Sequence, residues 1–340
     1  MKSFSSEVLK IDCDAESKRI CEFIRKTVLK DYRRRGVVVG ISGGIDSALT
    51  ATLCVKTFGK EKVFGIILPE KESSPESEVF GRHLAEWLGI KMETIPITPI
   101  LERLGVYQGR DAIVRKYFPA FGEGWRYKMV ISKDTLEREG LNIFYLDVVG
   151  EDGVAKKARL SLTDYLEMVA ATDMKQRTRM MQLYFHAEKR NYIVGGTTNK
   201  SELLQGFFVK YGDGGVDMEP IAHLYKTQVF QLAEFLGIPQ EIVKRTPSPD
   251  TWSAGVSDEE FYFRIPYDLL DLLLYAHEQQ IPLEDVSKVL NMSPEKIMRL
   301  YKDFDAKNKA TWHLRIMPPS LIPSFTPIEN PAACSGDEGN

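Results

Sequence analysis

Residues 37–53 constrain the fold of this chain more than any other stretch, because they read as a strand, a glycine turn and a helix in immediate succession. The three valines at 37–39 are β-branched, which favours an extended strand. The apolar spacing over 48–53 favours a helix. Gly43 and Gly44 stand in the turn between them and let a ligand approach the main chain closely. The free N–H groups and the dipole of the helix then favour a bound anion, typically a phosphate.

Asp46 is the unusual member of this turn, because a carboxylate repels a phosphate unless a cation lies between them. We therefore interpret Asp46 as a Mg²⁺ ligand. The turn lacks the Gly-Lys-Ser/Thr of a Walker A loop and the spacing of a Rossmann G-x-G-x-x-G motif. The string from Ser42 to Ser47 instead resembles the PP-loop of ATP pyrophosphatases, which cleave ATP between its α- and β-phosphates. The alternative is an ordinary glycine turn capped by Asp46 or Ser47.

The rest of the first half alternates predicted strands and helices. We expect helices over 14–34 and 77–88, and further strands over 63–68, 92–96 and 191–196. This alternation is typical of βαβ units, so the sequence predicts an α/β fold with a doubly wound, mostly parallel sheet flanked by helices. The loops that follow the first strand and the strand at 191–196 lie at the carboxyl ends of the strands, where such sheets bind ligands.

The chain is expected to form one α/β domain over 1–320, with an insertion at about 107–162 and an extended or disordered tail over 321–340. Within the insertion, 142–149 and 154–160 flank a glycine-containing turn and predict a β-hairpin. The segment before it is rich in aromatic residues. A lid, an oligomer contact and a local packing cluster all fit that segment, and the cluster is the favoured interpretation.

Charge and hydropathy exclude several classes of protein. The net charge of −3 offers no basic field for nucleic acid, and the helix-turn-helix-like segment 282–305 carries nearly balanced charges. No apolar run is long enough to span a membrane, and the first residues are too polar for a signal peptide, so we expect a cytoplasmic protein. The four cysteines show no C-x-x-C spacing, which argues against a zinc site and a disulfide framework.

A second cluster of charged residues and glycines occupies residues 197–226. Glu202 follows a predicted strand end at the start of a predicted helix, so it is placed to share a cation with Asp46. The alternative for Glu202 is a charge that complements the helix dipole. Asp213 lies in Tyr-Gly-Asp-Gly-Gly, a loop whose glycines allow a substrate to approach closely.

Taken together and in order, these motifs resemble NAD synthetase. The resemblance rests on the PP-loop and on six further segments, and it covers about 20–106 and 165–320. The six segments are 196–202, 206–217, 220–229, 257–260, 267–271 and 313–319.

The resemblance implies an adenine-nucleotide α-hydrolase-like fold and an ammonia-dependent ligase. Such an enzyme amidates deamido-NAD with ammonia through an acyl-adenylate, giving NAD, AMP and pyrophosphate, with ATP as co-substrate and Mg²⁺. The family forms homodimers. The implied ATP-binding residues are Gly40, Ile41, Ser42, Gly43, Gly44, Ile45, Asp46, Ser47, Thr197, Lys226 and Ser248. Asp46 and Glu202 would bind the metal, Arg177, Lys210, Asp217 and His313 would bind deamido-NAD, and Asp213 and Lys226 would be catalytic.

Departures from the family pattern motivate a related PP-loop amide ligase, acting on a different carboxylate, as the alternative function. Ile45, Val256 and Leu314 replace residues that are usually Gln, Gln and Lys, and Ser248 replaces a Thr. The insertion has no counterpart in the compact family members. Because the first strand begins near residue 36, we expect no fused glutaminase domain, so ammonia would come from solution or from a separate donor protein.

Two further classes are less consistent with the sequence. A tRNA-modifying PP-loop enzyme would use a basic surface or catalytic cysteines, and the sequence shows neither. A nucleotide sensor without activity leaves the combination of Asp46, Glu202 and Lys226 unexplained.

Overall fold

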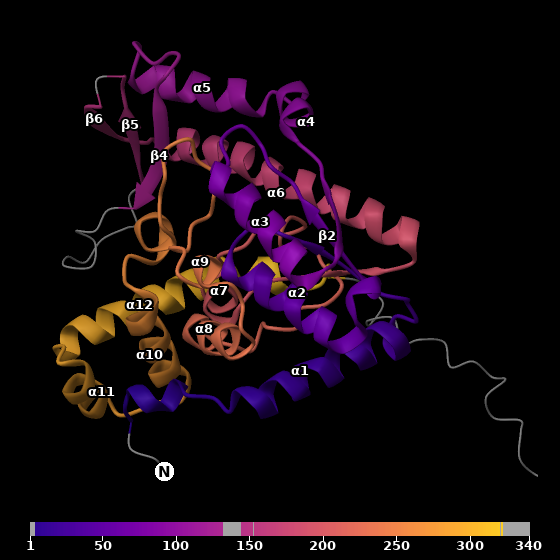
Figure 1. Ribbon diagram of the computed structural model, residues 1–340. Helices are drawn as coiled ribbons and strands as arrows, with labels where there is room; N and C mark the ends of the chain where they lie inside the picture. The colour runs from indigo at the N-terminus through magenta and orange to yellow at the C-terminus, as the bar shows by residue number, and fades with distance from the viewer. Residues whose placement is uncertain (1–3, 132–143, 152, 320, 322–340) are drawn as a thin grey trace, which may run out of the picture.

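A computed structural model describes residues 4–131, 144–151, 153–319 and 321 of the chain (Figure 1). Its central feature is a four-stranded parallel sheet in the order β3-β2-β1-β7. The predicted strands and their parallel arrangement are confirmed. The four strands are β1 (Val37–Gly40), β2 (Val63–Ile67), β3 (Lys91–Thr94) and β7 (Ile193–Gly195).

Helices cover both faces of this sheet, because successive side chains of the central strand point to opposite sides. Val37 and Val39 are fully buried in the apolar core that they share with α1 (Cys13–Lys26), α2 (Ile45–Phe58) and α8 (Lys226–Phe235). Val38 is equally buried on the opposite face, against α4 (Thr98–Arg103) and α6 (Leu162–Arg190). The α/β doubly wound architecture that the sequence predicts is therefore confirmed.

Further helices complete the two layers. α3 (Pro75–Leu88) packs on β2, and α5 (Val106–Tyr117) packs on α6. The short helical turns η2 (Thr27–Asp31) and η3 (Lys60–Lys62) follow α1 and α2, respectively.

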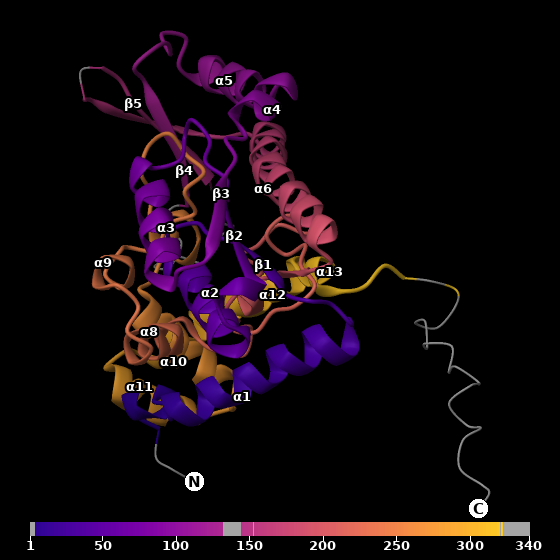
Figure 2. The same cartoon turned by 45° about the vertical axis from the view of Figure 1, so that its right-hand side comes forward.

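The insertion forms a second sheet of three antiparallel strands, β4 (Arg126–Ile131), β5 (Phe144–Val149) and β6 (Ala155–Arg159). Figure 2 shows it at the top of the molecule, beside α5. The β5–β6 hairpin confirms the prediction, although residues 142, 143 and 152 of the predicted hairpin lie outside the described residues. The sequence analysis missed β4.

The aromatic residues of the insertion form a local packing cluster, as the favoured interpretation has it. The rings of Phe121 and Tyr127 lie 5.5 Å apart, and those of Tyr127 and Trp252 lie 6.2 Å apart. Trp252 belongs to a distant part of the sequence. The cluster therefore joins the insertion to the second half of the chain.

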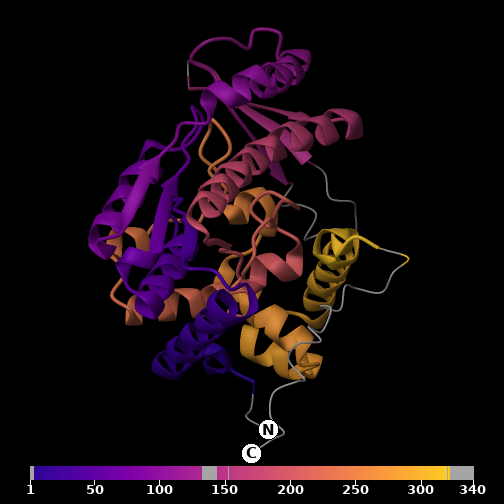
Figure 3. The same ribbon diagram turned by 90° about the vertical axis from the view of Figure 1, so that its right-hand side faces the viewer.

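The C-terminal helices build a separate apolar core with the N-terminal turn η1 (Ser6–Leu9). Figure 3 shows these helices in orange and yellow beside the sheet. They include the helix pair predicted over 282–305. The predicted tail over 321–340 lies outside the described residues apart from Leu321. The helical elements of this half are α7 (Lys200–Gln205), α9 (Gln240–Val243), η5 (Glu259–Phe263), α10 (Tyr267–Glu278), α11 (Leu283–Leu290), α12 (Pro294–Ala310) and α13 (Trp312–Arg315).

None of the helices in the described part of the chain combines the length and the apolar character that a membrane crossing requires.

Candidate active site

A cavity of about 870 Å³ lies at the carboxyl ends of β1, β2 and β7. This volume is typical of a site for a nucleotide-sized ligand. Most of the site residues predicted from the sequence line it, and only Gly43 and Asp217 do not. The predicted residues in the cavity wall are Gly40, Ile41, Ser42, Gly44, Ile45, Asp46, Ser47, Arg177, Thr197, Glu202, Lys210, Asp213, Lys226, Ser248 and His313.

The glycine turn is shaped as the sequence predicts. Gly43 has a positive φ of 75°, and a Cβ atom there would lie 2.4 Å from the carbonyl oxygen of Ser77. Gly43 therefore permits the turn without lining the cavity itself. Gly44 caps α2 with no side-chain hydrogen bond, so the first N–H groups of this fourteen-residue helix remain available to a ligand.

Lys226 lies between the two predicted metal ligands. Its ammonium donates hydrogen bonds to Asp46 Oδ2 at 2.5 Å and to Glu202 Oε1 at 3.4 Å. Burial lowers the pKa of Lys226. The carboxylates of Asp46, Glu202 and Asp258 oppose this, Asp46 most strongly, and together they raise the pKa above its usual value. Burial raises the pKa of Glu202, and the neighbouring Asp46 raises it further although Lys226 opposes this. Three carboxylates thus surround one ammonium.

Glu202 is held by the start of α7. Its N–H donates to Asn199 Oδ1, and the N–H of Asn199 donates back to Glu202 Oε2, which makes a capping box. The second oxygen, Oε1, faces Lys226. The side-chain amide nitrogen of Asn199, Nδ2, also donates to Asp46 Oδ1 at 3.0 Å. The helix-start role of Glu202 is confirmed, and its second oxygen faces the site, so a shared cation with Asp46 stays a prediction.

A buried carboxylate from α10 supports this arrangement from behind. Asp271 accepts hydrogen bonds from the Ser201 hydroxyl at 2.5 Å and from the N–H of Thr227 at 2.7 Å. The Ser201 oxygen in turn accepts from the N–H of Lys226 at 3.1 Å. Asp271 therefore fixes the first turns of α7 and α8, which carry Glu202 and Lys226.

The carboxylates fit a Mg²⁺ ion that also binds the substrate. Among the described residues, no three His, Cys, Asp or Glu side chains are arranged to hold a metal by themselves. Mg²⁺ in nucleotide sites commonly takes one or two carboxylates and completes its shell with phosphates and water. Asp46 and Glu202 supply such a pair at the glycine turn, with the ammonium of Lys226 between them.

Asp258 is a site residue that the sequence analysis missed. It lines the cavity, accepts a hydrogen bond from the Tyr267 hydroxyl at 2.9 Å, and has a pKa that burial raises to about 6. The Ser257–Glu260 motif marked the segment but gave no role to this carboxylate.

The predicted substrate residues Arg177, Lys210 and His313 come together at another part of the cavity. Arg177 Nε donates to the carbonyl oxygen of Lys210 at 3.4 Å, and Lys210 Nζ donates to that of His313 at 2.7 Å. Asp213 opens onto the cavity and accepts from the N–H of Val209. The protein around the cavity raises the pKa of Asp213 to about 6 through desolvation.

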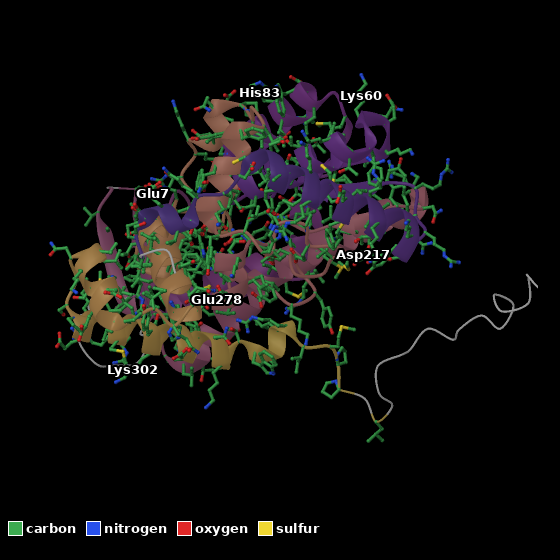
Figure 4. The ribbon with its side chains drawn as sticks, turned by 90° about the horizontal axis from the view of Figure 1, so that it is seen from below. Glu7, Lys60, His83, Asp217, Glu278 and Lys302 are labelled. Atoms are coloured by element: carbon green, nitrogen blue, oxygen red, sulfur yellow. The ribbon has the colours of Figure 1, made fainter. Side chains whose placement is uncertain are left out.

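Asp217 lies outside the cavity wall, unlike the other three predicted substrate residues. Its carboxylate accepts hydrogen bonds from the N–H of Val194 and from the Tyr184 hydroxyl, so it joins β7 to α6. In the view from below, Asp217 lies in the right half of the molecule, whereas Glu278 lies among the C-terminal helices (Figure 4).

The insertion also reaches the cavity. Met129 and Phe144, from β4 and β5, line it together with Trp252. The ring of Phe144 stacks on that of Tyr165 at 4.2 Å, and Tyr165 is another wall residue. One part of the wall is therefore aromatic, while the part at the glycine turn is polar.

Comparisons with known proteins agree with the resemblance. A family model described as NAD synthase matches residues 16–116 and 137–312. An NH(3)-dependent NAD(+) synthetase of Mesorhizobium japonicum is 47% identical over 311 residues, covering 92% of this chain and 97% of the relative. One from Thermotoga maritima is 38% identical over 297 residues, covering 85% and 94%.

Solved structures support the fold. The NMN synthetase from Francisella tularensis superposes with a TM-score of 0.62 at 24% identity, covering 93% of this chain and 100% of that one. The NH3-dependent NAD synthetase from Campylobacter jejuni gives 0.60 at 24% identity, covering 92% and 100%.

Proposed function

Because the chain belongs to the NAD synthase family, we propose that it joins ammonia to the nicotinate carboxylate of deamido-NAD at the expense of ATP. The products are NAD, AMP and pyrophosphate. The structural observation that supports this assignment is the meeting of Asp46, Glu202 and Lys226 at the glycine turn that opens α2.

The chemistry requires activation of the carboxylate, since oxide is a poor leaving group. A carboxylate oxygen attacks the α-phosphorus of ATP, the bond to the β-phosphate oxygen breaks, and pyrophosphate leaves. Ammonia then attacks the carbonyl carbon of the acyl-adenylate, and AMP departs with the bonding electron pair. The first step depends on holding two polyanions together, so cationic groups and oriented N–H donors stabilise it.

The residues of the site divide this work. The first N–H groups of α2 and the hydroxyls of Ser42 and Ser47 bind the phosphates, and Lys226 offsets their charge. Asp46 and Glu202 would hold Mg²⁺, which would supply positive charge for the phosphate oxygens. Thr197 and Ser248 contact the nucleotide from the cavity wall.

Asp213 acts in the second step, the attack of ammonia on the acyl-adenylate. Ammonia in neutral water is mostly ammonium, which cannot attack until it loses a proton. The Asp213 carboxyl, with its pKa of about 6, is mostly ionised near neutrality and can orient ammonium and accept that proton. Arg177, Lys210 and His313 bind deamido-NAD at the adjoining part of the wall. Asp217 stays a predicted substrate residue, and its carboxylate lies outside this wall.

Exposed apolar side chains at η2 and on α6 support a homodimer, and we take them as one patch. Leu29, Tyr32, Met181 and Phe185 are each between 42% and 57% exposed. Tyr32 and Tyr184 both lie close enough to Asp217 for its charge to raise their pKa values further, after the larger effect of burial. A second copy of the chain would cover this patch and bring the surface around Asp217 into the interface. We place the reaction in the cytoplasm, where ATP is supplied, with ammonia either free or delivered by a separate protein.

A different carboxylate is the second candidate substrate. Leu314 lines the cavity beside His313, and the insertion adds Met129 and Phe144 to the wall. An apolar wall of this kind suits a substrate less charged than a dinucleotide.

The deciding experiment supplies purified protein with ATP, Mg²⁺ and ammonium, and offers deamido-NAD beside a panel of other carboxylates. NAD and AMP should appear in equal amounts with deamido-NAD. If AMP forms with another acid and not with deamido-NAD, that acid is the substrate and the second candidate is correct. If no acid gives AMP, the protein binds nucleotide without catalysing this reaction.

A further inference from the structure

The edge of strand β4 is hydrogen-bonded to a segment more than 100 residues further along the chain. The carbonyl oxygen of Tyr127 accepts from the N–H of Ala254 at 3.0 Å, and the N–H of Tyr127 donates to Ser253 Oγ at 3.0 Å. Lys128 Nζ donates to the carbonyl oxygen of Gly255 at 3.2 Å and to the carboxylate of Glu260. The insertion therefore holds the residues that follow Trp252 through both main-chain and side-chain hydrogen bonds.

Buried charges hold the preceding residue of the same segment. The carbonyl oxygen of Thr251 accepts from Lys175 Nζ at 2.9 Å and from Arg110 Nη1 at 3.3 Å. Both side chains are 0% exposed, and their charges are balanced by Glu70 and Glu72. Two cations that converge on one carbonyl oxygen in the protein interior fix that oxygen firmly.

Arg110 adds a second contact through its guanidinium plane. The plane lies 4.3 Å from the ring centre of Trp252 and 5.1 Å from that of Tyr127. Its Nε and Nη2 atoms are buried without a hydrogen-bond partner among the described residues, so these rings form much of its surroundings. Arg110, from the insertion, thus sets the position of Trp252, a cavity wall residue.

The other side of the segment is tied to the loop after β2. Asp250 accepts from the N–H of Ser74 at 2.7 Å and from the Ser77 hydroxyl at 2.6 Å. Ser77 also accepts from Arg245, whose second nitrogen reaches the carbonyl oxygen of Ser42 in the glycine turn. Residues 246–252 all line the cavity, and Ser248 among them is a proposed ATP contact.

We propose that Arg110 and the edge of β4 are positioning elements that hold residues 246–256 in the ligand-binding arrangement before the nucleotide arrives. The insertion is then a fixed scaffold for one wall of the ATP site. The inference rests on the proposed function only in taking the nucleotide to be ATP. Its physical consequence is a lower entropic cost of ATP binding, because the segment is ordered in advance.

The test measures amide hydrogen exchange over 246–256 and the Kd for ATP with Mg²⁺, in the full chain and in two variants. Arg110→Lys keeps the charge but removes the plane that contacts Trp252. Ser253→Ala removes the two hydrogen bonds that its hydroxyl makes with the N–H and the carbonyl oxygen of Tyr127, and it is a milder change. Lys116→Met is the matched control, since Lys116 lies on the same helix and pairs with Asp164, away from the segment.

In the native chain, the Ala254 amide should exchange slowly without ATP and change little when ATP is added. In both variants it should exchange faster without ATP and recover with ATP. The Kd for ATP should rise by about two- to tenfold, the effect of losing one or two hydrogen bonds. The turnover number at saturating ATP should stay near that of the native chain, and Lys116→Met should change none of these quantities.

Two results would overturn the inference. One is fast exchange over 246–256 in the native chain until ATP is added. The other is a lower melting temperature in both variants with exchange and Kd unchanged, which would make the contacts merely structural. Neither measurement needs turnover, so failure to make NAD from deamido-NAD would reject the proposed function and leave this inference standing.

Discussion

The ammonium of Lys226 and the carboxylate of Asp46 meet at 2.5 Å, although 180 positions separate them in the chain. Asp46 follows β1, and Lys226 opens α8, which packs on the same face of the sheet as α2. Glu202 and Asp258 complete the group, so three carboxyl groups face one ammonium at the glycine turn. A group with this excess of carboxyl groups is unfavourable for phosphates alone and favourable for phosphates that arrive with Mg²⁺.

Asp46→Asn should therefore reduce Mg²⁺-dependent pyrophosphate release by about 10²-fold or more, because it removes one metal ligand and one negative charge. The fold should persist, since Lys226 still faces Glu202. Initial rates against Mg²⁺ concentration, with circular dichroism on the same sample, measure both effects. Asp14→Asn, at an exposed pair with Lys18, is the control. Near-native turnover in Asp46→Asn would show that the site is assigned wrongly.

The glycine turn and the meeting of Asp46 with Glu202 could be predicted because both follow from local pattern and parallel-strand topology. A run of buried valines implies a central strand, and residues after neighbouring parallel strands share one edge of the sheet. Glu202 is also a helix cap, which the sequence allowed as an alternative.

The rest depended on long-range contacts that no local pattern encodes. β4 carries the buried residues Tyr127, Met129 and Ile131, but its partners are β5, the Ser253 hydroxyl and the N–H of Ala254. Asp258 reaches the site only because η5 and α10 pack beside α7. Asp217 was predicted to bind substrate, and the pairing of its carboxylate with Val194 and Tyr184 depends on how β7 and α6 meet.

Asp271→Asn should alter the pH dependence of stability. Burial raises the pKa of Asp271 to about 6, against about 3.9 for an unfolded Asp. Between these values the folded state binds more protons than the unfolded chain, so this contribution to the free energy of unfolding is fully present below about pH 4. It is lost as the pH rises through about 6. The difference in free energy of unfolding between native and variant should therefore fall by up to about 3 kcal/mol from pH 4 to pH 6.5.

Urea unfolding at several pH values measures this difference. Asp268→Asn is the matched control, since it replaces an exposed carboxylate of the same helix. A native-minus-variant difference that is flat with pH would contradict the assignment.

Arg177→Ala should weaken the binding of deamido-NAD and leave the binding of ATP unchanged. A lost charge-assisted contact with a phosphate or carboxylate raises KM by about 10- to 100-fold, whereas the KM for ATP should stay near native. Steady-state kinetics with each substrate varied in turn separates the two. Arg19→Ala, at an exposed pair with Glu16, controls for loss of a surface arginine. If both KM values rose together, Arg177 would act on the whole cavity instead of on one substrate.

Phe185→Asp should convert a dimer into monomers. Phe185 is 57% exposed on α6, beside Tyr184, which binds Asp217. A carboxylate buried without a partner in an apolar interface is strongly unfavourable, whereas on a free surface it costs little. Val79→Asp is the matched control, because Val79 is 61% exposed on α3, outside the patch. Sedimentation should show twice the chain mass for the native protein and for Val79→Asp, and the single mass for Phe185→Asp. A native monomer, or a dimer that tolerates Phe185→Asp, would mean that this patch is not the interface.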